Sequence, residues 1–298
     1  MKISKRKKGS SYAADADVFR ERKERYRLKK EDWWKYALSL FLIALYLFPF
    51  YVLLNVALKP FTDASSRLIP PHPVYLGNFK ALMESCKIFM GMKNSLIITV
   101  LVLAVHIAVG CPAAYALSRH QSKFNEFIRN MIMGVMMITP LTILVGVYST
   151  MSKIHGTSTY WGIVLVLSSF SLPLTIFLYT NFIASIPRDL DEAAAIDGAS
   201  NFQTFFIIIF PQLKAVTTTV VIIQGVAAWN EYTYSYYFLQ KESLKTVTLV
   251  IQSFFGTVLN DYGQAAANAA VGMLPMLVLY LFLQKYFIQG QIDAAIKS

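Results

Sequence analysis

Charged residues are scarce in this chain of 298 residues, because Asp, Glu, Lys and Arg make up only 15% of it while hydrophobic residues make up 55%. A soluble globular domain has about 25% charged residues. The hydrophobic residues are gathered in long uncharged blocks, the first of which covers residues 36–58. This pattern excludes an ordinary soluble domain and predicts a protein that lies within a membrane.

The motifs of several enzyme classes are also missing. The two cysteines, Cys86 and Cys111, form no C-x-x-C pair or Cys/His cluster, so we expect neither a metal site nor a disulfide framework. There is no G-x-x-x-x-G-K-[ST], H-E-x-x-H, G-x-S-x-G or dinucleotide fingerprint. The apolar blocks also lack the paired carboxylates of a membrane enzyme. We therefore expect no catalysis and no bound cofactor.

Positive charge is concentrated in the first thirty residues of a chain whose formal net charge is +11. A basic segment can bind nucleic acid, but an apolar block follows this one at once, which favours a tail held on the cytoplasmic side of a membrane. There it can also contact anionic lipid. The first block is too long for a signal-peptide core, so we expect a retained anchor and no nucleic-acid partner.

Six blocks are each long enough to cross a membrane as a helix. They cover residues 36–58, 95–117, 130–151, 160–183, 213–239 and 265–283. Six crossings place both termini on one side, which the basic tail makes cytoplasmic. Pro140, Pro173 and Pro275 lie inside three of the blocks, where a kink can line a path or simply reflect the frequency of proline in membrane helices.

The loop 185–211 between the fourth and fifth blocks is predicted to form helix–turn–helix. Pro187 suits the first helical position, and the acidic residues that follow it favour the start of a helix. Gly198 can end that helix in the left-handed conformation. Ser200 and Gln203 have the spacing of a capping box for a second helix, and Pro211 is expected to bend the chain into the fifth block.

Such a compact element is suited to transmitting motion between a partner protein and two membrane helices. The alternative is an ordinary amphipathic connector that rests on the membrane surface. The residues alone leave both interpretations open.

The loop resembles the E-A-A-x3-G-x9-I-x-L-P signature of the permease subunits of bacterial binding-protein-dependent ABC importers. The matching positions are Glu192, Ala193, Ala194, Gly198, Ile208 and Pro211, and Asp197 belongs to the same core. Two positions differ, because Phe210 replaces the usual leucine and Ala215 stands where a second proline is frequent. The second change implies a softer bend into the fifth block.

Weaker segments extend the resemblance to the carbohydrate-uptake branch and to its shorter, six-span permeases of the maltose-transporter type. They are residues 94–98, 113–119, 160–162, 171–178, 228–232 and 284–290. The resemblance implies an all-α polytopic fold of the type I importer class, with a cytoplasmic coupling helix between spans four and five. The implied organisation is a tail (1–35), a first span (36–58), an extracytoplasmic segment (59–93), a transport domain (94–287) and a C-terminal tail (288–298).

The resemblance also implies the partners: a second, different permease, an ABC ATPase dimer that binds the ATP and Mg²⁺, an extracytoplasmic solute-binding protein and the lipid of a bacterial plasma membrane. By the same resemblance, Glu192 contacts the ATPase, Ala193 and Ala194 permit a close approach, and Gly198 aims the helix. Ile208 and Pro211 fix the loop to span five.

Residues that line the path of a sugar are harder to predict. Candidates are the polar and aromatic side chains Gln224, Trp229, Asn230, Tyr232 and Asn268. For the aromatic residues, packing and interfacial anchoring are the alternatives. His106 lies within the second block, where a neutral histidine bonded to a neighbouring helix is the alternative to a functional group. Rival functions are a permease for glycerol phosphate or a polyamine, or a secondary transporter, which the lack of an internal repeat disfavours.

Overall fold

The computed structural model describes residues 33–120, 122–255, 261–282 and 284. The secondary-structure elements of these described residues are all helices. The chain divides into two compact units after Val52. The helices are α2 (Trp33–Ala57), α3 (Gly77–Ser85), α4 (Lys87–Val105), α5 (Cys111–Arg119), α6 (Lys123–Met136), α7 (Leu144–Lys153), α8 (Tyr160–Ala184), α9 (Asp189–Ile196), α10 (Asn201–Gln203), α11 (Lys214–Trp229), α12 (Thr233–Phe238), α13 (Val247–Gln252) and α14 (Tyr262–Gly272). The predicted tails lie outside the described residues, apart from residues 33–35.

Five helical segments of the described residues are long and apolar enough to cross a membrane. They are Trp33–Ala57, Lys87–Arg119, Tyr160–Ala184, Asn201–Trp229 and Tyr262–Phe282. The helices of the first and fourth predicted spans have the predicted bounds to within three residues. The second starts eight residues earlier than predicted, and the fifth starts twelve residues earlier and ends at Trp229.

The predicted third span, 130–151, is broken at Pro140 much more sharply than the kink that we expect there. The segment forms α6 and then a helical piece from Pro140 to Lys153, and the two are bent by 92°. Pro140 begins a short 3₁₀ turn, because proline has no N–H for the helical ladder and its ring clashes with the preceding turn. The bent pair makes a sixth span only if both pieces are counted together.

Two of the long segments contain a stretch of π-helix. His106–Gly110 joins α4 to α5, and Thr204–Ile209 joins α10 to the chain that leads into α11. A 3₁₀ turn, Phe210–Leu213, then carries Pro211. The bend expected at Pro211 is therefore a local change of helix type within one continuous segment. Such irregular turns are frequent at functional sites in helices.

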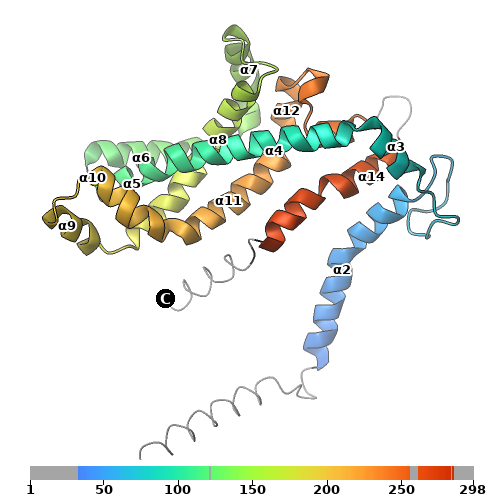
Figure 1. Ribbon diagram of the computed structural model, residues 1–298, viewed down its shortest axis with the longest axis horizontal. Helices are drawn as coiled ribbons and strands as arrows, with labels where there is room; N and C mark the ends of the chain where they lie inside the picture. Colours follow the sequence, from blue (N-terminus) through green and yellow to red (C-terminus); the bar gives the residue numbers. More distant parts are fainter. Residues whose placement is uncertain (1–32, 121, 256–260, 283, 285–298) are drawn as a thin grey trace, which may run out of the picture. The chain divides into compact units, whose positions relative to one another are not determined.

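In the second unit, α5, α8 and α11 pack around a core that lies near α9. Tyr179, Ile183, Ile209 and Leu213 are fully buried in this cluster. Gly110 lets α8 approach closely, because a Cβ there would lie 3.0 Å from the side chain of Thr175. Figure 1 shows α9 and α10 at one end of this bundle and α3 at the other. We call these the loop end and the α3 end.

Candidate functional site

The loop end is built from α9, a tight turn and the start of the long segment that leads to α11. Asp189, Asp191 and Glu192 lie in the first turn of α9, where negative charge is favourable next to the unpaired N–H groups. The helix begins at Asp189, so the prediction that Pro187 takes the first helical position is wrong by two residues. Pro187 precedes the N-cap, Arg188, which makes no side-chain cap.

The predicted turn and second helix start are confirmed. Gly198 has a φ of +83°, a conformation that L residues rarely adopt. The Ser200 side chain accepts from the backbone N–H of Gln203, and the Gln203 side chain accepts from the backbone N–H of Ser200, at 3.3 and 2.8 Å. This capping box fixes the direction in which the chain leaves the turn.

An ion pair fastens α9 to the end of α5. The Arg119 Nη2 and Asp191 Oδ2 atoms are 2.9 Å apart, and the two side chains are only 8% and 20% exposed. Tyr115 donates its hydroxyl to Asp191 Oδ1 at 2.6 Å, and Arg119 Nη1 donates to the carbonyl of Ile186 at 3.1 Å. We call this group of Tyr115, Arg119 and Asp191 the clamp. It joins α9 to a helix more than seventy residues earlier in the chain.

The signature residues of α9 point in different directions. Ala194 is only 2% exposed and packs within this chain, whereas Glu192 and Ala193 are exposed. Ile196, on the exposed side, is 86% exposed, and Phe202 beyond the turn is 71% exposed. The small side chain at 194 therefore lets α9 lie close to its own chain, and the exposed face combines a carboxylate with large apolar groups.

The remaining loop residues lie in the turn and in the segment that follows it. Asp197 is the exposed C-cap of α9. Ile208 packs against the buried cluster of α5, α8 and α11, and Pro211 is exposed in its 3₁₀ turn.

A second polar group lies inside the bundle, around His106. Its Nε2 is 2.8 Å from Ser171 Oγ, and its Nδ1 is 3.2 Å from Thr175 Oγ1. Gln224 donates Nε2–H to Thr175 Oγ1 at 3.2 Å. The side chains of His106, Thr175 and Gln224 are at most 3% exposed. We call this group the inner network. His106 is therefore hydrogen-bonded to the neighbouring helix α8, as expected in the alternative to a functional group.

The other path candidates lie toward the α3 end, in two kinds of environment. Trp229 is buried in an apolar cluster with Ala266 and Ala267, and Asn268 is buried with its Oδ1 unpartnered among the described residues. Asn230 is exposed after α11, and Tyr232 is 37% exposed. Their role in a path stays a prediction, as it does for Gln224.

Glu231 has a structural role that the sequence did not reveal. Its carboxylate accepts the backbone N–H groups of Tyr234 and Ser235 at 2.6 and 2.8 Å and so caps α12. Burial, and then the charge of Glu231, raise the pKa of Tyr234.

Sequence reasoning missed the clamp and the partners of His106. Arg119 and Asp191 were each visible as charged residues, but their pairing depends on how α5 packs beside α9. Ser171 and Thr175 are four residues apart and thus share one face of α8, which is a usable signal once α8 is placed against His106.

Comparisons with known proteins find similarity to membrane components of transport systems. The family model described as "Binding-protein-dependent transport system inner membrane component" matches residues 106–292. The melibiose/raffinose/stachyose import permease protein MelC of Bacillus subtilis is 39% identical over 251 residues, which cover 84% of this chain and 91% of MelC. The multiple sugar-binding transport system permease protein MsmG of Streptococcus mutans is 33% identical over 285 residues, covering 91% of this chain and all of MsmG.

The fold is also similar to that of a solved structure. A chain of a bacterial ABC transporter involved in the import of the acidic polysaccharide alginate superposes with a TM-score of 0.74 at 17% identity. The match covers 87% of this chain and 98% of that chain.

Proposed function

The chain belongs to the family of binding-protein-dependent transport system inner membrane components, and from this premise we propose that it takes up a sugar or oligosaccharide as one of two different permease subunits of an ATP-driven importer. The names of the curated relatives MelC and MsmG support sugars as the substrate class. The sequence has no phosphate-binding loop, so we assign ATP and Mg²⁺ to a partner ATPase dimer.

The observation that carries this proposal is the attachment of α9 to two membrane helices at once. The clamp joins α9 to α5, and only the turn at Gly198 separates α9 from the segment Asn201–Trp229. A push on α9 therefore acts on the second and fifth spans together. Closure of the ATPase dimer would supply that push, and ATP shifts the balance through its higher affinity for the closed state.

The exposed face of α9 is suited to a protein partner. Glu192 offers a carboxylate, and Ala193 lets another surface approach closely. Ile196 exposes 86% of its surface next to the turn, which is costly in water and favours a partner that covers it. We infer that Ile196 enters the ATPase cleft together with Glu192. Ala194 holds α9 to its own chain instead.

This assignment sets the orientation of the chain. The loop end and both termini would face the cytoplasm, and the α3 end would face the solute-binding protein outside. Tyr232 lies on the outward side in this arrangement, with its ring 5.6 Å from that of Tyr236. Exposed aromatic rings of this kind suit sugar faces, so we place the mouth of the translocation path there.

The test is co-purification of the tagged chain, expressed with its genomic neighbours, followed by assays of ATP hydrolysis and sugar uptake. We expect a second permease and an ATPase to remain bound to the wild type. Glu192→Ala should weaken ATPase retention, and Gly198→Asp should leave hydrolysis without uptake.

Glu84→Ala is the matched control, because Glu84 is an exposed glutamate at the α3 end. It should retain the ATPase and transport normally. A lone chain or homodimer that retains no ATPase would overturn the proposal, and so would normal uptake by Gly198→Asp. A partner binding protein loaded with a polyamine or glycerol phosphate would overturn the sugar assignment alone.

A further inference from the structure

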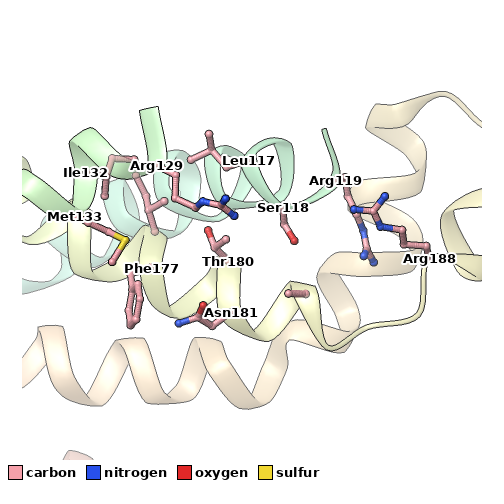
Figure 2. A pocket seen from close by; sticks show the side chains of 12 residues that line it. Leu117, Ser118, Arg119, Arg129, Ile132, Met133, Phe177, Thr180, Asn181 and Arg188 are labelled. Carbon is pink, nitrogen blue, oxygen red and sulfur yellow. The ribbon is translucent and has the colours of Figure 1, made fainter. Parts of the chain in front are cut away.

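A cavity of about 500 Å³ lies at the loop end, between α5, α6, α8 and the residue that precedes α9. Three arginines line it: Arg119 at the end of α5, Arg129 on α6 and Arg188 before α9. Figure 2 shows their side chains coming from these three separate elements around one space. Three separate parts of the chain thus bring positive charge to one cavity.

The positive charge is only partly neutralised. Asp191 pairs with Arg119, but Arg129 and Arg188 have no ion pair or side-chain hydrogen bond within the described part of the chain. Two guanidinium groups that share a cavity repel each other unless an anion lies between them. Each guanidinium offers a planar fork of N–H donors that fits two oxygens of a phosphate or carboxylate.

The wall between the arginines adds neutral hydrogen-bonding groups. Thr180 is only 9% exposed, and its hydroxyl has no hydrogen-bond partner among the described residues. In Figure 2 this hydroxyl points toward the guanidinium of Arg129, with Ser118 and Asn181 close by. A buried hydroxyl without a partner is costly, so this wall is suited to a polar ligand.

The rest of the lining is apolar and follows the direction of the helices. Phe177 lies two turns before the end of α8, whereas Arg188 lies four residues beyond that end. Ile132 and Met133 likewise lie beyond Arg129 along α6. Figure 2 shows these three apolar side chains at the end of the cavity away from Arg119 and Arg188. The cavity therefore has Arg119 and Arg188 at the end near α9 and these apolar side chains at the other end, with Arg129 between them.

We propose that this cavity binds the phosphate of an anionic phospholipid from the leaflet next to the loop end. The guanidinium groups of Arg129 and Arg188 hold the phosphate, and Thr180 donates its hydroxyl to it. An acyl chain lies along Phe177, Ile132 and Met133. A free phosphate has the same charged chemistry but leaves the apolar end empty, so the amphipathic lining favours the lipid.

The place of the site gives it a consequence for the loop. Arg119 belongs to both the clamp and the cavity, and Arg188 is the N-cap of α9. A bound phosphate draws Arg129 on α6 and Arg188 toward one point and so restrains α9. The effect on transport rests on the proposed function, whereas the binding itself does not.

The test is a titration of the purified full chain, with the subunits that it retains, in a nonionic detergent. The probe is dioctanoyl phosphatidylglycerol, with dioctanoyl phosphatidylcholine and inorganic phosphate as separate arms. The variants are Arg129→Gln and Arg188→Gln, singly and together, because both side chains are exposed and unpaired and their loss should leave the fold intact. Arg129→Lys keeps the charge without the fork. Lys123→Gln removes an exposed charge from α6 that does not line the cavity.

We expect phosphatidylglycerol to bind saturably and about tenfold more weakly to each arginine-to-glutamine variant, since each loses a charge-assisted contact. Lys123→Gln should bind like the wild type, Arg129→Lys should fall between, and phosphatidylcholine should bind at least tenfold more weakly. Equal affinity in wild type and double variant, or equal binding of the two lipids, would overturn the site.

Competition by inorganic phosphate that is as tight as the lipid would support the phosphate site and overturn the lipid as its source. These readouts need neither ATP hydrolysis nor uptake, so they stand apart from the test of the proposed function.

Discussion

The clamp and the inner network both attach a later helix to the second span, yet they use different groups. The clamp attaches α9, and the inner network attaches α8. At the loop end, Arg119 and Asp191 carry full charges, and 20% of the Asp191 side chain remains exposed. Inside the bundle, the partners of His106 are the neutral hydroxyls of Ser171 and Thr175, and His106 and Thr175 are completely buried. The cost of burying an unpaired charge explains the division, because a full charge is tolerated only where a partner and some water remain.

The polar side chains of the inner network are linked by a series of hydrogen bonds. Ser171 donates to the carbonyl of Leu167 at 2.6 Å, so its oxygen is free to accept Nε2–H from His106. Thr175 Oγ1 accepts from Gln224 and also lies 3.2 Å from His106 Nδ1 and 3.4 Å from the carbonyl oxygen of Ser171. The network can therefore hold α8 and α11 to the second span without an ion pair.

The comparison teaches where this chain can move. The inner network is enclosed, and a change there would expose several buried polar groups at once. The clamp lies at the water-accessible end, next to the helix that we propose to be pushed. We therefore expect motion of α9 to be transmitted at least in part through the clamp, while the inner network keeps the three helices together.

Removal of the charge at position 191 should break the clamp and give the largest effect. In Asp191→Asn, Arg119 keeps its charge but loses its counterion in a site where it is only 8% exposed. Loss of one partner of a buried pair costs about 3 kcal/mol, and the partial exposure of Asp191 reduces this to about 2. We expect uptake to fall more than tenfold while the protein still inserts, measured as transport per inserted molecule.

Asp189→Asn is the matched control, because Asp189 is an exposed acid in the same first turn and makes no ion pair among the described residues. It should keep at least half of wild-type uptake. If both variants lose uptake equally, negative charge near the start of α9 matters and the pairing with Arg119 does not.

The parts of this fold that depend on local chemistry could be predicted from the sequence. The lengths of the uncharged blocks predicted most of the long apolar helices. The Ser200–Gln203 spacing predicted a capping box that the structure contains. Gly198 was expected to be left-handed, and it is. Each of these features depends on residues within one or two helical turns of each other.

The parts that depend on packing could not be predicted. No local pattern near Arg119 predicts its pairing with Asp191, because the two residues meet only where α5 and α8 run side by side. The exposed Ala193 and the buried Ala194 look identical in the sequence, and only the docking of α9 separates them. The break at Pro140 was predicted as a kink within a span, and the sequence did not reveal that the following segment turns by 92°.

Loss of the Thr175 hydroxyl should test the inner network with a smaller effect. Thr175→Val keeps the shape of the side chain but leaves His106 Nδ1 and the Gln224 amide without this partner. We expect a loss of about 1–2 kcal/mol of stability, measured from the midpoint of thermal unfolding in detergent.

Thr99→Val is its control, because Thr99 is 4% exposed and its hydroxyl has no partner within the described residues. That variant should unfold at or above the wild-type temperature. Equal losses in the two variants would mean that the network contributes nothing beyond packing.

The turn between α9 and α10 can be tested through backbone strain alone. A Cβ at Gly198 would meet no atom within 4 Å, so Gly198→Ala introduces no clash and only the cost of a φ of +83°. That cost is about 1 kcal/mol for alanine and less for asparagine, which tolerates the left-handed region. Uptake should therefore fall several-fold in Gly198→Ala and less in Gly198→Asn. The reverse order would show that side-chain size matters at 198.

Loss of the capping box should give the smallest effect of the series. In Ser200→Ala the N–H of Gln203 loses its acceptor at an exposed helix start, which costs about 0.5–1 kcal/mol. Ser200→Asp restores an acceptor and should recover most of the loss, measured as uptake per inserted molecule. Because the box lies on the α11 side of the turn and the clamp on the α5 side, Ser200→Ala combined with Asp191→Asn separates the two connections. If the fractional losses of uptake multiply in the double variant, α9 acts on the second and fifth spans independently. If the double variant transports no worse than Asp191→Asn, the motion of α9 passes through α5 alone.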